Sequence, residues 1–90
     1  MPTFVVKRHL PGITPEALTG AGVRVKSCAR AMQDEGREVK WIRSFFLADT
    51  EETHCYFEGP NVESIEKLNE RAQIPFQEIV EVAEMTPDSV

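Results

Sequence analysis

Two histidines and two cysteines are the residues of this 90-residue chain best suited to bind a metal ion or to act as a nucleophile. His9 precedes a Pro-Gly pair, and His54 is followed directly by Cys55. Imidazoles suit zinc, nickel and iron, and a carboxylate can complete such a set of ligands. His54 and Cys55 would point to opposite faces of a regular strand, so they cannot chelate one ion together. Which side chains can meet depends on the elements that carry them.

The first third of the chain predicts a strand and a helix. Residues Thr3 to Leu10 are β-branched and aromatic at first, and Pro11-Gly12 ends the run with turn chemistry. Thr14 followed by proline and glutamate predicts an N-cap and the first turn of a helix. Gly36 is the expected C-cap. One apolar stripe follows the predicted helix, at Leu18, Ala21, Val25, Cys28 and Met32.

The remainder predicts a hairpin, a second helix and a fourth strand. Val39 to Leu47 and Thr53 to Glu58 are two strand-like runs around the acidic loop ADTEE, which we interpret as a solvated hairpin tip. Asn61 is suited to cap the second helix, and Glu78 to Met85 alternates as a strand does. The apolar spacing of the second helix runs through Val62, Ile65, Asn69 and Ala72.

This order predicts an α+β fold, the ferredoxin-like β-α-β-β-α-β sandwich, with a four-stranded antiparallel sheet and two helices on one face. We expect a single domain over residues 1–90, with a core in 1–85 and a frayed tail in 86–90. The first and third strands should be central and antiparallel to each other. His9 would then lie near His54, and the second helix would bring Asn69 to the same rim of the sheet.

Strand alternation predicts which residues face the helices. Phe4, Val6, Cys55 and Phe57 should face them, and the opposite face should carry the following residues: Val5, Lys7, His9, His54, Tyr56 and Glu58. His9 and His54, joined by Glu58 or Tyr56, are therefore the most coherent set of metal ligands. Cys28 and Cys55 are expected to be reduced and packed in the interior as small apolar side chains.

The face that carries the histidines is not an ordinary solvated surface. Val5 and Tyr56 lie on it, and the second strand is apolar on both sides, with Trp41, Ile42, Phe45 and Phe46. A sheet that is apolar on both faces needs two covers. We therefore expect a homodimer closed sheet to sheet or edge to edge.

Charge and segment composition exclude several classes of partner. The net charge is −5, without a cluster of lysine and arginine, so the chain would repel a nucleic-acid backbone. No signal-peptide pattern or membrane-length apolar run is present, which predicts a cytoplasmic protein without a membrane partner. Phosphate-binding glycine loops and Ser-His-Asp sets are also missing, so we assign no catalytic residue and expect no organic cofactor.

Several short motifs in the right order resemble one known family. They are FVVKRHLPGITPEAL near the start, Cys28, THCYFEGP in the third strand and NERAQIP at the end of the second helix. The chain resembles small dimeric ferredoxin-like proteins, long catalogued as a domain of unknown function and named after a nickel-binding, nickel-responsive member. The resemblance implies binding of nickel or another divalent transition metal by histidine and cysteine. In the second helix the chain departs from the family, since Asn69 and Ile74 occupy positions where the family carries histidines.

Three functions therefore compete. The first is binding of a transition-metal ion. The second is a small dimeric α+β-barrel enzyme or small-molecule-binding protein, with a cavity between sheet and helices and with His54, Tyr56 or Asn69 as the polar group. The third is a dimerisation module without chemistry. Asn69 needs a partner on its apolar stripe: it either bonds a buried backbone group or, with Cys28 and Cys55, lines a small cavity.

Overall fold

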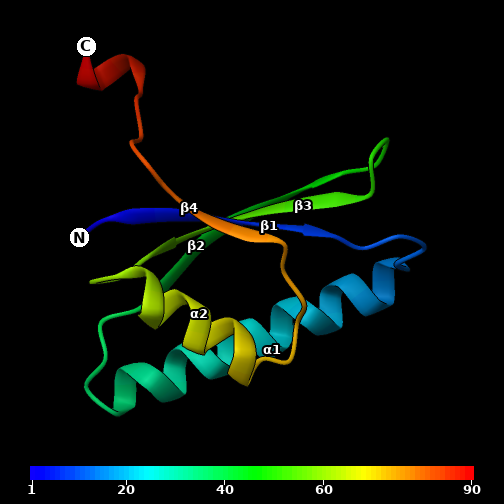
Figure 1. The fold of residues 1–90 in the computed structure, drawn as a ribbon, viewed down its shortest axis with the longest axis horizontal. Helices are drawn as coiled ribbons and strands as arrows, with labels where there is room; N and C mark the ends of the chain where they lie inside the picture. The colour runs from blue at the N-terminus through cyan, green and yellow to red at the C-terminus, as the bar shows by residue number, and fades with distance from the viewer.

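Helices and strands follow one another in the predicted order in a computed structural model that describes residues 1–90 (Figure 1). They are β1 (Thr3–His9), α1 (Pro15–Asp34), β2 (Lys40–Leu47), β3 (Glu52–Glu58), α2 (Val62–Arg71) and β4 (Glu78–Val82), with a short 3-10 turn at Pro87–Ser89. The prediction that the fourth strand reaches Met85 is wrong. β4 pairs with β1 alone, and β1 begins at Thr3, which lies opposite Val82. Residues beyond Val82 therefore have no strand beside them.

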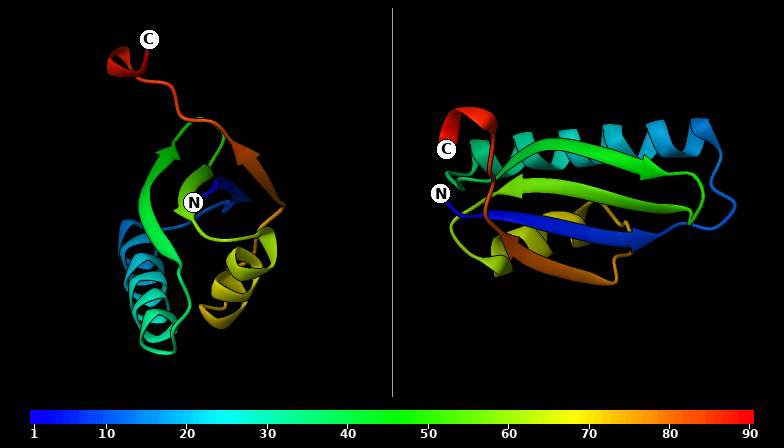
Figure 2. Two further views of the ribbon diagram at one scale, coloured as in Figure 1. Left: turned by 90° about the vertical axis from the view of Figure 1, so that its left-hand side faces the viewer. Right: turned by 90° about the horizontal axis from the view of Figure 1, so that it is seen from above.

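The four strands form one antiparallel sheet in the order β2-β3-β1-β4, with β1 and β3 central (Figure 2). The ferredoxin-like β-α-β-β-α-β fold is thereby confirmed. β2 is an edge strand, and its pairing with β3 is interrupted by a bulge between Trp41 and Arg43. No helix of the chain combines the length and the hydropathy that crossing a membrane requires.

The helix ends form where the capping residues predict them. The hydroxyl of Thr14 accepts a hydrogen bond from the N–H of Ala17 at 3.1 Å, and Oδ1 of Asn61 accepts one from the N–H of Ser64 at 3.0 Å. After α1 the C-cap is Glu35, one residue before the expected Gly36, and Gly36 adopts a φ of 85°, which glycine reaches without steric cost. The N–H of Arg37 then donates to the carbonyl of Met32 at 2.9 Å, as a Schellman motif requires.

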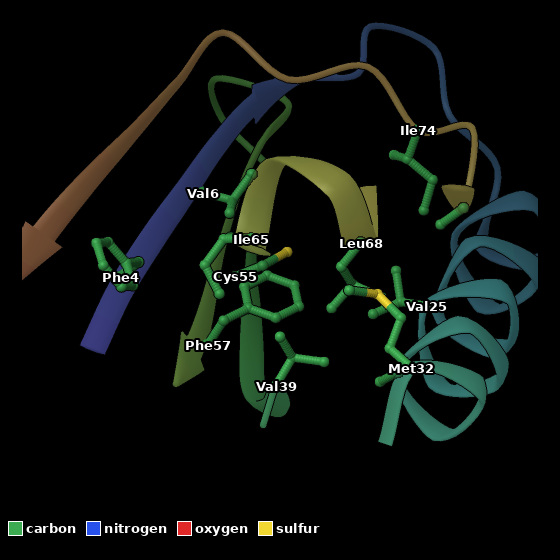
Figure 3. Packing of buried hydrophobic residues seen from close by; sticks show 12 residues of the cluster. Phe4, Val6, Val25, Met32, Val39, Cys55, Phe57, Ile65, Leu68 and Ile74 are labelled. Carbon is green, nitrogen blue, oxygen red and sulfur yellow. The ribbon is translucent and has the colours of Figure 1, made fainter. Parts of the chain in front are cut away.

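Both helices cover the same face of the sheet, and the hydrophobic core lies between them and the strands (Figures 1 and 3). The predicted faces of β1 and β3 are confirmed, because Phe4, Val6, Cys55 and Phe57 are buried in this core. The other face of the sheet has no α-helix over it, although the C-terminal tail rises on that side (Figures 1 and 2), and we call it the open face. The remaining core members are Val25, Ala29, Met32, Val39, Ile65, Leu68, Ala72 and Ile74.

An ion pair joins the last turn of α2 to the C-cap of α1. Nη1 of Arg71 donates to Oε1 of Glu35 at 2.9 Å, and Arg37 approaches the same carboxylate at 4.0 Å. The hydrogen bond from Arg71 is the main reason that the pKa of the Glu35 carboxyl lies below its ordinary value of 4.5, and the positive charges of Arg71 and Arg37 add to it.

We expect Glu35→Gln to flatten the loss of stability in acid. A carboxyl whose pKa is lowered by folding stabilises the protein above its unfolded pKa, and that contribution disappears as pH falls through the folded pKa. Unfolding midpoints in urea from pH 7 to pH 3 should therefore fall less steeply for the variant below about pH 4.5. The effect is small because both side chains are solvated. Glu70→Gln, which removes an exposed carboxylate without an ion pair, is the control, and identical profiles for the two variants would contradict the prediction.

Candidate functional site

The two histidines lie on the open face of neighbouring central strands. His54 of β3 is directly opposite Lys7 of β1, and His9 is opposite Glu52, so the imidazoles are diagonal neighbours rather than a direct pair. His9 is exposed and His54 is half-buried. Lys7, which is directly opposite His54 and two residues before His9 on β1, forms an ion pair with Glu78 of β4 at 3.4 Å.

The third ligand considered from the sequence is far from this pair. Glu58 is four residues beyond His54 on the same strand, or about 13 Å along it, and it is opposite Thr3 at the other end of β1. Within one chain no three His, Cys, Asp or Glu side chains come close enough to hold a metal ion. The donor types suit a divalent transition metal, but their number in a single chain does not complete a site.

Asn69 lies at the same end of the sheet as the histidines, since it bonds Arg8 next to His9, but on the other face, so the expectation that the three side chains converge is wrong. The helices cover only the face opposite the histidines. Asn69 belongs to α2 and is fully buried on that side. Its Nδ2 donates to the carbonyl of Ile65 at 2.8 Å, so of the two alternatives for Asn69 the structure shows the bond to a buried backbone group. Its Oδ1 accepts a hydrogen bond from Nη2 of Arg8 at 2.7 Å. Asn69 therefore binds the guanidinium of Arg8 and does not face an imidazole.

Arg8 is the polar residue that sequence reasoning missed. Only 3% of it is exposed, and its Nη1 also donates to the carbonyl of Pro75 at 3.4 Å. The three ion pairs of the chain involve Lys7, Arg37 and Arg71, so no carboxylate neutralises the guanidinium of Arg8. The signal was present, because the alternation that turns Phe4 and Val6 toward the helices turns Arg8 the same way.

A cavity of about 460 Å³ opens beside Arg8, between the first half of α1 and strands β1, β2 and β3. Thr53 lines it from β3, directly opposite Arg8, and its buried hydroxyl has no hydrogen-bond partner. Cys55, from the same strand, also lines the cavity, as Ile74 does. The rest of the wall is formed by Leu10, Leu18, Thr19, Ala21, Gly22, Val23, Val25, Lys26, Trp41, Ser44, Phe45, Phe46 and Phe57.

The other pocket residues considered from the sequence do not line this cavity. Cys28 is half-buried and packs against the core, and neither it nor Asn69 belongs to the wall. Tyr56 lines a different hollow of about 420 Å³ on the open face, beside Phe45 and Val82. Both cysteines are free. The side chains suited to acid–base chemistry, His54 and Tyr56, thus lie on the face opposite the larger cavity.

Gly22 shapes the wall of the cavity on the helix side. A Cβ at this position would lie 3.4 Å from the ring of Trp41, which is an ordinary van der Waals contact, so the indole packs against α1 at Gly22 without requiring glycine there. The indole N–H donates to the hydroxyl of Ser44 at 2.9 Å, which fixes the ring. Neither Gly20 nor Gly22, the two glycines that weaken the helix, is explained by a close approach of another atom.

Comparisons with known proteins agree with the fold and with the resemblance. The family model described as nickel responsive protein SCO4226-like matches residues 4–82. A solved structure, titled as the crystal structure analysis of SCO4226 from Streptomyces coelicolor A3(2), superimposes with a TM-score of 0.79 and 22% sequence identity, covering 93% of this chain and 99% of that one. At this identity the structural match establishes a shared fold. No curated protein sequence matches the chain.

Proposed function

The chain belongs to the family of SCO4226-like nickel-responsive proteins, and from this membership we propose that it is a homodimer that binds a divalent transition-metal ion such as nickel. The observation that carries the proposal is the pair His9 and His54, which share the open face on neighbouring strands. Imidazole is a preferred ligand of nickel, zinc and copper, and these are the only two imidazoles of the chain.

A second copy of the chain would supply the ligands that one copy lacks. Two imidazoles leave a divalent ion with open coordination positions, and a two-fold axis near this end of the open face would add the same two from the partner. Glu58, also on this face, is outside this shared ligand set, because in each copy it lies about 13 Å along β3 from His54 and so from an ion held by the imidazoles of both copies.

The open face has the surface that a second copy would cover. Phe45 is 57% exposed there and packs edge to face against Tyr56, with ring centroids 6.3 Å apart. Leu47 and Val80 are exposed on the same face, from β2 and β4. An apolar surface spread over three strands is unusual for a monomer and favours association through this face.

Titration of the metal-stripped protein with nickel, zinc and copper tests the proposal. We expect saturable binding with one ion per two chains, measured by calorimetry, and sedimentation of a dimer. His9→Ala and His54→Ala should each weaken binding about tenfold or more, because each removes a ligand from both halves of the site. Glu84→Gln, which removes a carboxylate outside the proposed ligand set, is the control and should bind as the unmodified chain does.

Val80→Arg separates the dimer from the ligands. The variant keeps both imidazoles, adds no metal ligand and places a charge in the proposed contact opposite Val5, so it should sediment as a monomer and bind the metal more weakly. Absence of binding tighter than micromolar in the unmodified protein would refute the metal proposal. A monomer that binds one ion per chain would refute the shared site.

The larger cavity bears on the two other candidate functions. A ligand-sized cavity with buried polar groups is more than a dimerisation module needs, while His54 and Tyr56 on the opposite face cannot act as its acid or base. A ligand in the cavity and a metal ion on the open face would therefore occupy separate sites.

A further inference from the structure

We propose that the cavity between α1 and the sheet binds a small apolar monocarboxylate, with its carboxylate on Arg8 and Thr53 and its hydrocarbon part along the aromatic wall. This site is independent of the metal proposed for the open face. Three features of the cavity carry the proposal: a buried cation without a counter-ion, an unsatisfied hydroxyl beside it, and an apolar lining.

The first feature is the uncompensated charge of Arg8. A guanidinium stays charged in proteins, and burying a charge without an opposite one is costly. Here its hydrogen bonds go to two neutral oxygens, of Asn69 and Pro75, so further N–H donors remain for a ligand. The chain has 15 acidic and 10 basic residues, yet the charged residues of the wall are Arg8 and Lys26 and no acid. The cavity is therefore selective for an anion.

The second feature is the hydroxyl of Thr53. Native proteins leave few buried polar atoms without a partner, and Thr53 Oγ1 is the one buried side-chain atom of this chain that has none. Thr53 and Arg8 are directly opposite each other on β3 and β1, and both belong to the wall. One carboxylate group placed between them would accept a hydrogen bond from the hydroxyl and from the guanidinium together.

The third feature, the apolar wall, determines the chemistry of the part of the ligand beyond its carboxylate. Beyond Arg8 and Thr53 the wall is largely apolar, with Trp41, Phe46, Leu18 and Ile74 among its members. A volume of about 460 Å³ lies within the range of small-ligand sites, which bury most of an apolar ligand. The single buried cation favours a monoanion, because a phosphate dianion would leave part of its charge uncompensated in apolar surroundings. A medium-chain fatty acid and an aromatic acid share this chemistry.

The sole tryptophan of the chain lies in the wall, so its fluorescence reports directly on the cavity. We expect octanoate and 1-naphthylacetate, titrated into the full metal-stripped chain, to change that fluorescence with a dissociation constant on the order of 100 µM for ligands of about ten to fourteen non-hydrogen atoms. Tighter binding of octanoate would identify a linear tail, and tighter binding of 1-naphthylacetate an aromatic one. Octanol, which has the same chain without the charge, should bind at least about tenfold more weakly, and inorganic phosphate should not bind.

Two variants test the polar groups separately. Thr53→Val keeps the shape but removes the hydroxyl and should weaken octanoate about three- to tenfold without changing octanol. Arg8→Met should weaken octanoate tenfold or more and abolish the preference over octanol. Arg30→Met, which replaces an exposed arginine of α1 outside the wall, should bind like the unmodified chain. Arg8→Met also removes the hydrogen-bond partner of Asn69. If Arg8→Met does not fold for that reason, Thr53→Val is the variant that tests the proposal.

Several results would overturn the proposal. Equal affinity for octanoate and octanol would show that the cavity does not select an anion, and no response to either carboxylate at millimolar concentration would show that it does not bind one. The same holds if Thr53→Val leaves octanoate binding unchanged. Backbone amide shifts on octanoate addition must include Arg8 and Thr53; shifts confined to the open face would place the ligand elsewhere.

Discussion

Replacing Asn69 with leucine is expected to lower the free energy of unfolding by about 3 kcal/mol, although leucine is the residue that an apolar helix stripe ordinarily carries. The Asn69 side chain is fully buried, and its Oδ1 is the closest hydrogen-bond partner of the Arg8 guanidinium, at 2.7 Å. Leucine would leave the buried charge with the carbonyl of Pro75 alone, at 3.4 Å. The shift of the midpoint of urea unfolding, at unchanged slope, measures the loss.

A double-mutant cycle separates the charge from the change in packing. Combined with Arg8→Met, the leucine variant no longer leaves a buried cation unpaired, so the double variant should recover most of the loss. Asn69→Asp keeps an acceptor for Arg8 and should cost less than leucine. If Asn69→Leu by itself is as stable as the unmodified protein, the bond to Arg8 contributes nothing to folding and the prediction is wrong.

The second large effect is expected for Met32→Ala, at about 3 kcal/mol of unfolding free energy. Met32 is fully buried and joins α1 to the core near Val25 and Leu68 (Figure 3). Alanine is the best helix former, so the loss would come from the cavity and the lost contacts rather than from the helix.

The chain offers a matched control for this change. Met85 lies beyond the last strand and is 76% exposed, so Met85→Ala should change the unfolding free energy by less than about 0.5 kcal/mol. Equal losses for the two variants, measured by the same urea titration, would mean that Met32 is not packed in the core as described.

Sequence patterns predicted the fold because its elements are marked locally. Thr14, Asn61 and Gly36 bound the helices through their own side chains or backbone angles, and strand alternation separated the two faces of β1 and β3 correctly. The end of β4 could not be predicted from its own residues. Its length is set by the place where β1 begins, which is a property of the pairing and not of the segment from Val82 to Met85.

The candidate site was predicted less well, because two regularities oppose each other at Arg8. Alternation places Arg8 with Val6 on the helix side, whereas single basic residues on strands are usually exposed. Placing Asn69 with the histidines conflicted with the same alternation, since helices on one face cannot meet side chains of the other. The volume beside Arg8 had no sequence signal, because it depends on the angle between α1 and the sheet.

The bulge of β2 has a consequence for how copies of this chain can meet. β2 is an apolar edge strand, and a straight edge of that kind is a template on which strands of other copies can add without limit, as in aggregation. The extra residue between Trp41 and Arg43 breaks the regular spacing of N–H and C=O groups along that edge. The same strand can therefore offer Phe45 to a partner across its face while resisting growth into fibres along its edge.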